Sequence, residues 1–236
     1  MSGEENYESL LNRFAFVFSP PFTDLYTKVL AAIDSNLTVD CAHTLADRLL
    51  SAAVTYPHDV DAIVLPIANA LPQRADILVT DSGYTNESFP RIVKAHLGDL
   101  LGDILNETDL HKPKQTEVSP SNRVLAGALF SGSSVKNHLF DTGLIYWFAR
   151  KGLMLLDEPV AEERQEVVSL GTCLQLLVMG DVMVEKGLRA GVDLPKIVEA
   201  LEALRENKVV QNARGIQLLE RTIAAAKARR GDSLNL

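Results

Sequence analysis

Few side chains in this sequence have the types and spacing that catalysis or metal binding requires. No two of the five histidines are three or four residues apart, the spacing that would place two ligands on one helix face. The histidines are His43, His58, His96, His111 and His138. Residues 131–134 lack the second glycine of a nucleophile elbow, and we find no Gly-rich phosphate-binding loop, H-E-x-x-H or C-x-x-C motif. These observations predict a protein that is not an enzyme and uses no cofactor or metal ion.

Two further groups of reactive side chains have ordinary structural explanations. The acidic cluster in residues 157–163 could bind a cation, but acidic side chains are also favoured at the start of a helix by the helix dipole. We favour the second explanation. The two cysteines, Cys41 and Cys173, fall on apolar faces of expected helices. This placement is typical of reduced core residues in an intracellular protein, so we expect neither a disulfide nor a metal site.

Charge is distributed unevenly along the chain, whose formal net charge is −8. Residues 1–110 hold sixteen acidic and six basic side chains, whereas residues 205–236 hold seven basic and three acidic ones. The acidic half disfavours broad non-specific binding of nucleic acid, while the basic end could contact phosphate. Alternatively, the cations only complement the dipole at the end of a helix. The candidate contact residues on this last helix are Arg214, Arg221, Lys227, Arg229 and Arg230.

The first of three amphipathic helices predicted in residues 119–186 has clear local signals for its start. Ser119 is a good N-cap, and Pro120 occupies the first helical position, where its missing N–H costs nothing. We expect Gly132 and Ser133 to break this helix, because glycine and serine are typical of turns.

The other two helices of this stretch follow at short intervals. The second is predicted over about residues 134–150, with Gly152 closing it. The side chains that it should turn towards the core are Leu139, Leu144, Trp147 and Phe148. The third begins near residue 159 and places acidic residues in its first turns. Its apolar positions, which should face the core, are Val167, Leu170, Cys173, Leu174 and Leu177. Helices of this kind bury their apolar faces by stacking on neighbours, as in helical-repeat proteins.

The first half of the chain predicts four firm helices, over residues 23–34, 38–54, 57–71 and 88–105. Thr38 is the expected N-cap of the second. Pro66 is expected to kink the third or end it early. The apolar run at residues 77–79 could form a strand, but we interpret it as an ordered loop or the tail of a helix.

Two helices are predicted at the end of the chain. One is capped by Asp193, and the other covers about residues 209–230. The last helix is expected to bury Ile216, Leu219, Ile223 and Ala226.

The spacing of these helices predicts the fold. Nine or ten helices, mostly in antiparallel pairs of about 40 residues, indicate an all-α fold, specifically an α-solenoid of about five antiparallel HEAT-type helix pairs. We expect residues 1–21 to form an N-terminal arm, residues 22–231 to form a single domain with a polar loop near 106–118, and residues 232–236 to form a tail.

The N-terminal sequence and the hydropathy pattern predict a cytoplasmic location. The first ten residues are acidic and lack the apolar core of a signal peptide. No run of 18 apolar residues occurs in the sequence, so no membrane-spanning segment is expected.

Several segments resemble the MIF4G domain, the middle domain of the translation factor eIF4G. Residues 26–33 and 43–71 are similar to the family's opening helices, and residues 122–140 resemble its most recognisable segment, a helix ending in Leu129-Phe130. Residues 162–186, with Leu176-Leu177 at their centre, and residues 212–223 resemble the helices that follow. The resemblance covers roughly residues 22–230.

The resemblance implies a non-catalytic scaffold in translation initiation or mRNA metabolism. Members of the family stack five HEAT-type helix pairs and commonly bind a DEAD-box RNA helicase such as eIF4A; some also bind RNA. By this resemblance, the expected contacts are the basic last helix and the turn residues Lys136 and Asn137. The pattern that recruits the cap-binding protein eIF4E, Y-x-x-x-x-L-Φ, is not found. The alternative is a HEAT-like adaptor in transport or trafficking without a link to RNA.

Overall fold

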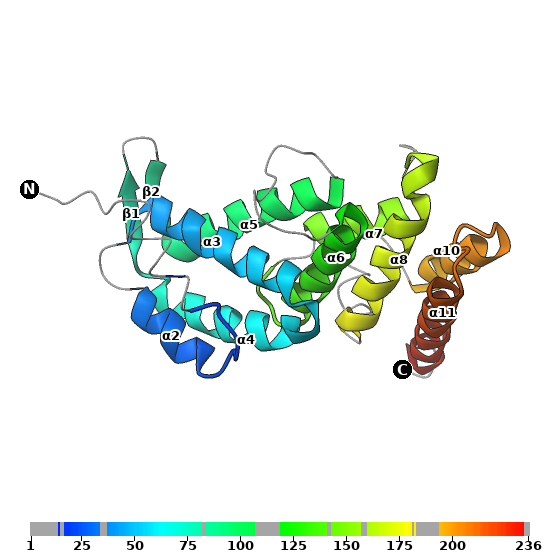
Figure 1. The fold of residues 1–236 in the computed structure, drawn as a ribbon, viewed down its shortest axis with the longest axis horizontal. Coiled ribbons are helices and arrows are strands. Elements are labelled where there is room, and N and C mark those ends of the chain that lie inside the picture. Colours follow the sequence, from blue (N-terminus) through cyan, green and yellow to red (C-terminus); the bar gives the residue numbers. More distant parts are fainter. Residues whose placement is uncertain are drawn as a thin grey trace, which may run out of the picture. The chain divides into compact units, whose positions relative to one another are not determined.

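Helices make up most of the structure, as expected (Figure 1). The computed structural model describes residues 14, 17–33, 37–81, 84–106, 119–140, 143–156, 160–180, 182 and 194–233. Its longer helices are α2 (Leu25–Ala32), α3 (Val39–Thr55), α4 (Val60–Ala70), α5 (Phe89–Asn106), α6 (Pro120–Lys136), α7 (Gly143–Gly152), α8 (Glu162–Met179), α10 (Leu194–Glu206) and α11 (Ala213–Ser233). Short helices η1 (Pro57–Asp59) and η2 (Leu71–Arg74) and strands β1 (Leu78–Asp81) and β2 (Tyr84–Ser88) complete the described elements. The predicted all-α class is confirmed, while the solenoid of about five helix pairs stays a prediction.

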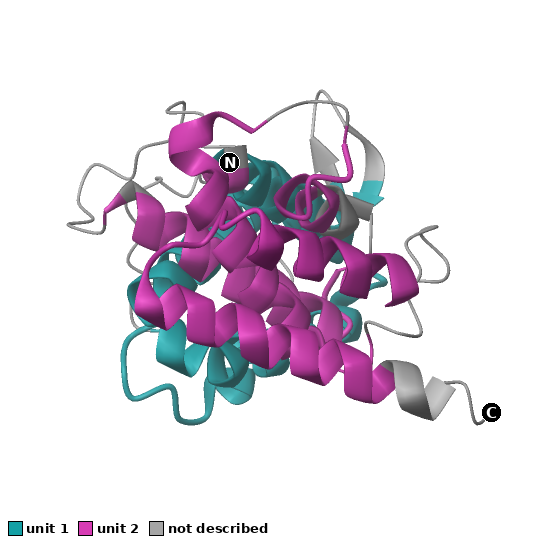
Figure 2. Cartoon of the chain, turned by 90° about the vertical axis from the view of Figure 1, so that its right-hand side faces the viewer, with its two compact units in different colours: residues 1–103, 108–116 teal, residues 104–107, 117–236 magenta. Residues whose placement is uncertain are grey.

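The chain divides into two compact units (Figure 2). The first comprises residues 1–103 and 108–116, and the second comprises residues 104–107 and 117–236. The division falls at the polar segment expected near residues 106–118, most of which lies outside the described residues. The expected single domain, arm and tail stay predictions, although Phe14, Val17 and Phe18 of the expected arm are buried.

Local signals determine where the helices of the first unit begin. Thr38 is the N-cap of α3, and its side chain accepts a hydrogen bond from the Cys41 backbone N–H at 3.1 Å. Helix α4 continues through Pro66 to Ala70, so of the two outcomes expected at this proline, a kink or an early end, the early end is wrong. Arg74 donates from Nε to the Ile33 carbonyl at 3.0 Å, which satisfies a carbonyl group at the end of α2.

The apolar run at residues 77–79 leads into a strand, so our interpretation as a loop or helix tail is wrong. Strand β1 pairs with β2 in an antiparallel hairpin, with Val79 opposite Glu87 and an irregular register between Val79 and Asp81. Val79 is buried and anchors the strand. The pairing depends on a partner strand of mixed polarity, Tyr84–Ser88, which has no strong apolar alternation to reveal it.

In the second unit, α6 does not break where we expected. Ser119 caps it by accepting a hydrogen bond from the Asn122 N–H at 3.3 Å, as predicted, but the helix continues through Gly132 and Ser133 to Lys136. A Cβ atom at position 132 would lie 2.8 Å from the Gln175 carbonyl oxygen of α8. Glycine is therefore present because two helix backbones touch here, and the packing overrides its low helix propensity.

Helices α6 and α8 run in the same direction along this contact. A Cβ atom at Gly171 would lie 3.3 Å from the Cβ atom of Ala128, and the contact of Gly132 with Gln175 comes four residues later in each helix. Small residues at the spacing of one helix turn thus let the two helices approach closely at successive turns. This parallel pair is the structural centre of the second unit.

The face of α8 that is buried differs from the apolar stripe that we predicted. Cys173 is buried as expected, but Val167, Leu170, Leu174 and Leu177 are only half-buried. The fully buried positions include the polar residues Ser169, Thr172 and Gln175. Gln175 Nε2 donates to Ser131 Oγ at 2.8 Å, and Ser131 Oγ donates to the Ala128 carbonyl at 2.8 Å. Hydrogen bonds to neighbouring helices, rather than hydrophobicity, account for the burial of Ser169 and Gln175, and Thr172 is buried against Gly152.

Helix α7 begins at Gly143 and α6 extends to Lys136, so the start that we predicted near residue 134 is wrong. Helix α7 packs its end on α8 and stops at Gly152, as predicted. Ser169 Oγ donates to the Gly152 carbonyl at 2.9 Å, and Met154 adopts the left-handed conformation that follows many helix ends. Phe148 is fully buried beside Gly171. Of the four core positions predicted for this helix, Leu139 and Phe148 are buried, whereas the side chains of Leu144 and Trp147 lie outside the described residues.

Both cysteines are buried and unbridged, as expected for core residues. Burial raises the pKa of the Cys173 thiol to about 12, which keeps it protonated and unreactive at neutral pH. Among the described residues, no helix is long and apolar enough to cross a membrane.

Candidate partner-binding surface

The basic last helix, α11, is fixed to the second unit along one face. Its buried positions, spaced as one helix face, are Gly215, Leu219, Thr222, Ile223 and Ala226. Leu219, Ile223 and Ala226 belong to a cluster that also contains Met179 of α8 and Leu201 of α10. Three of the four core positions predicted for this helix are therefore confirmed.

The prediction that Ile216 is the fourth core residue of α11 is wrong. Its side chain is 43% exposed. Position 216 lies on the edge of the helix, and Gly215 occupies the core position instead, because a Cβ atom there would lie 2.7 Å from Val210 Cγ1.

A carboxylate of α8 holds the start of α11. Glu166 Oε1 accepts hydrogen bonds from the Gln211 N–H at 2.9 Å, from the Asn212 N–H at 3.1 Å and from Asn212 Nδ2 at 2.7 Å. Asn212 in turn accepts a hydrogen bond from the Gly215 N–H at 2.7 Å, as an N-cap does. The backbone hydrogen bond from Gln211 is the main cause that lowers the pKa of Glu166, against a smaller opposing effect of burial. This contact fixes the direction in which α11 leaves the preceding loop.

We expect Glu166→Gln to lower the free energy of unfolding at pH 7 by about 1 kcal/mol, because the neutral amide accepts these hydrogen bonds more weakly than the carboxylate. The folded-state pKa of Glu166 lies below its ordinary value of 4.5, so its contribution is present above that value and is lost as pH falls through the folded-state pKa. Urea unfolding at pH 7 and below pH 4 should therefore show a difference that shrinks in acid. The control is Glu163→Gln, on the exposed first turn of α8. It should change the free energy of unfolding neither at pH 7 nor below pH 4.

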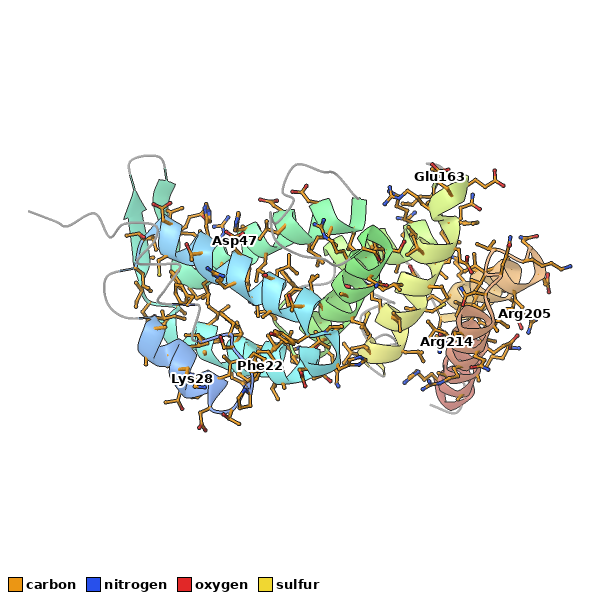
Figure 3. The ribbon with its side chains drawn as sticks, in the orientation of Figure 1. Phe22, Lys28, Asp47, Glu163, Arg205 and Arg214 are labelled. Carbon is orange, nitrogen blue, oxygen red and sulfur yellow. The ribbon has the colours of Figure 1, made fainter. Side chains whose placement is uncertain are left out.

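Lys227, one of the predicted contact residues, takes part in the α10–α11 contact. Its Nζ lies 2.6 Å from Glu202 Oε1 of α10. Arg205 of α10, which is labelled in Figure 3, lies 3.9 Å from Glu220 of α11 and 4.0 Å from Glu202. These charges are partly exposed, so each pair contributes at most about 1 kcal/mol. Lys227 is thus paired with Glu202 within the unit, although its side chain is half-exposed.

The face of α11 opposite the core is exposed and basic. Its positions, separated by three or four residues, are Arg214, Gln217, Arg221, Ala224 and Ala228, and all five are exposed. We call these five residues the outer face of α11. Arg214 and Arg221 lie about 10 Å apart along the helix axis, at a rise of about 1.5 Å per residue. The outer face carries two positive charges and no acidic residue.

The other predicted contact residues are placed differently. Arg229 is half-buried, and its Nη1 donates to the Ala225 carbonyl at 3.4 Å. The side chain of Arg230 lies outside the described residues. Lys136 is the exposed last residue of α6, and Asn137 follows it as C-cap, with Nδ2 donating to the Ser133 carbonyl at 2.9 Å. Asn137 thus has a structural role at the helix end, and Arg214 and Arg221 form the best-defined pair among the candidates.

A cluster that the sequence did not reveal lies in the first unit. The imidazole rings of His43 on α3 and His96 on α5 are stacked, with their centroids 4.1 Å apart and their planes at 24°. His96 Nε2 lies 3.3 Å from Asp47 Oδ1. The two histidines are 53 positions apart, so a search for pairs within one helix could not find them; only Asp47, four residues after His43, is a local signal. In the described part of the chain, no group of three or more His, Cys, Asp or Glu side chains is arranged to hold a metal ion.

Comparison with known proteins gives no match: no family model, no curated protein and no solved structure is similar to this chain.

Proposed function

We propose that this protein is a non-catalytic cytoplasmic scaffold that binds and activates a DEAD-box RNA helicase of the eIF4A type in translation initiation or mRNA metabolism. The resemblance of residues 22–230 to the MIF4G domain motivates the proposal. The observation that carries it is the outer face of α11, where Arg214 and Arg221 are exposed on a helix whose opposite face is buried. A rigid helix that presents two cations without an acid can bind an acidic protein surface.

The packing inside the second unit supports a scaffold of stacked helix pairs. Helices α6 and α8 are parallel and in close contact, and α7 connects them in sequence. Equivalent helices of successive pairs in a helical-repeat protein have this relation.

The proposed mechanism involves no chemistry by this chain. A helicase changes between open and closed arrangements of its two lobes, and a scaffold that binds the closed arrangement more tightly shifts the population towards it. The scaffold would thereby raise helicase turnover. The basic outer face could also contact RNA directly, which nuclease treatment distinguishes from binding to protein.

The test is a pull-down from cognate cell extract, with and without nuclease, using the native chain and a variant with Arg214→Glu and Arg221→Glu. We expect a DEAD-box helicase to be recovered after nuclease treatment, and we expect the variant to bind it about 10- to 100-fold more weakly, because both cations become repulsive. The matched control is Lys28→Glu with Arg91→Glu, which makes the same change of charge at exposed positions of the first unit.

The control variant should bind like the native chain. Equal weakening in both variants would show that net charge, rather than the outer face of α11, controls binding. A set of partners without any helicase would contradict the proposal and favour the alternative adaptor in transport or trafficking. Recovery that disappears on nuclease treatment would indicate that RNA bridges the two proteins.

A further inference from the structure

The stacked histidines connect two helices of the first unit. His43 and Asp47 are one turn apart on α3, and His96 comes from α5. His96 makes both contacts across the helix boundary, the ring stack with His43 and the approach to Asp47, which is labelled in Figure 3. When Asp47 is ionised it can only accept hydrogen bonds, so His96 Nε2 is the donor in this pair.

We propose that His43, His96 and Asp47 form an acid-sensitive junction between α3 and α5, which loosens when His43 takes up a proton beside the stacked ring of His96. The proposal concerns the stability of the first unit and is independent of the proposed partner.

The geometry determines which of the two rings lies next to a carboxylate. His96 lies 3.3 Å from Asp47 Oδ1, so a positive charge on His96 would be paired with the carboxylate. His43 is stacked on the other ring and has no such contact among the described side chains. Two imidazolium rings whose centroids are 4.1 Å apart would repel each other strongly, since partial burial reduces solvent screening. The pair therefore accommodates one charge well and two poorly.

Burial and the neighbouring carboxylates act on the pKa of His43 in opposite directions. Burial is the largest cause that lowers the pKa of His43 below its ordinary value of 6.5, and His96 is the next. Three carboxylates act in the opposite direction: Asp47 and Asp40 of α3, and Asp99 of α5. Their combined effect is smaller, so the pKa of His43 remains lowered.

The direction of the pH dependence follows from linkage. His43 binds a proton more weakly in the folded state than in the unfolded chain, so below pH 6.5 the unfolded state binds more protons. The contribution of His43 to the free energy of unfolding is therefore fully present above pH 6.5 and is lost as the pH is lowered towards the folded-state pKa. Histidine is suited to this role because it titrates between neutral and mildly acidic pH.

The experiment is an NMR titration of the histidine ring protons in the native chain, combined with thermal unfolding at pH 7.5 and pH 5.0. We expect the titration midpoint of His43 to lie below 6.5 and to move upward in His96→Gln, which removes the neighbouring charge. We also expect the melting temperature of the native chain to fall in acid more than that of His43→Phe, which keeps an aromatic ring in the stack but cannot be protonated. The control is His58→Gln, which replaces an exposed histidine outside the pair. Its melting temperature should fall in acid as much as that of the native chain.

Two results would overturn the proposal. One is a His43 midpoint at or above 6.5 in the folded native chain, a measurement that needs no variant. The other is an equal loss of melting temperature in the native chain and in His43→Phe, which would mean that protonation of His43 does not weaken the junction. If His43→Phe fails to fold, the native titration and His96→Gln still decide the question.

Discussion

Replacing Gly152 with alanine is expected to lower the free energy of unfolding of the second unit by about 2–3 kcal/mol, the usual cost of forcing extra atoms into a packed interior. The added Cβ atom would overlap Thr172 Oγ1 and lie 2.8 Å from the Val168 carbonyl oxygen. Thr172 is fully buried and cannot turn into solvent, and Val168 contributes a backbone atom of α8. The end of α7 must therefore move away from α8.

The measurement is urea unfolding followed by the fluorescence of Trp147, the only tryptophan of the chain, which lies in α7. The matched control is Gly98→Ala in α5, where nothing lies within 4 Å of the added Cβ atom. Since alanine favours a helix over glycine by up to about 1 kcal/mol, this control should be neutral or stabilising by circular dichroism. An unchanged midpoint for Gly152→Ala would contradict the close approach of α7 to α8.

Replacing Phe148 with alanine should have the larger effect, a loss of about 3–5 kcal/mol, typical of removing a fully buried aromatic ring. Phe148 is 0% exposed, and its ring lies 3.2 Å from the position that a Cβ atom of Gly171 would take. The ring fills the space that the glycine leaves on α8, so truncation removes apolar contacts and leaves a cavity between α7 and α8. We expect a marginal or unfolded second unit.

Two variants separate ring packing from a general sensitivity to substitution. Phe148→Leu retains most of the volume and should lose less than about 1.5 kcal/mol. Phe22→Ala in the first unit removes a partly exposed ring that meets Tyr56 edge-on at a centroid distance of 5.4 Å, and should lose about 1 kcal/mol. Equal losses for Phe148→Ala and Phe22→Ala in urea unfolding would show that Phe148 is not a core residue.

Both predictions concern contacts between helices whose partners the local sequence pattern does not reveal, although the pattern did place Phe148 in the core. In α8, periodicity selected four residues that are half-buried and missed Ser169, Thr172 and Gln175, which are fully buried. Which polar residues enter the core depends on neighbours that folding brings close. Gln175 bonds to Ser131 of α6, 44 positions earlier, whereas Ser169 bonds to the Gly152 carbonyl at the end of α7 and Thr172 packs against Gly152.

In the candidate site, too, the local pattern predicted some features and the tertiary structure decided others. The sequence predicted a basic last helix, and Leu219, Ile223 and Ala226 were correctly assigned to its core face. It could not distinguish Lys227, which pairs with Glu202 of α10, from Arg221, which is exposed on the outer face. That distinction depends on how α10 lies against α11.

The sequence by itself determined the helical class and most helix starts, because these depend on interactions within about four residues. Thr38 and Ser119 cap their helices as predicted, since an N-cap bonds a backbone group three positions away. Only the tertiary structure decided that α6 continues through Gly132, that β1 finds a partner strand, and that His43 stacks on His96. Each of these depends on an atom brought near by folding, from another helix or strand, which overrides or adds to the local preference of the chain.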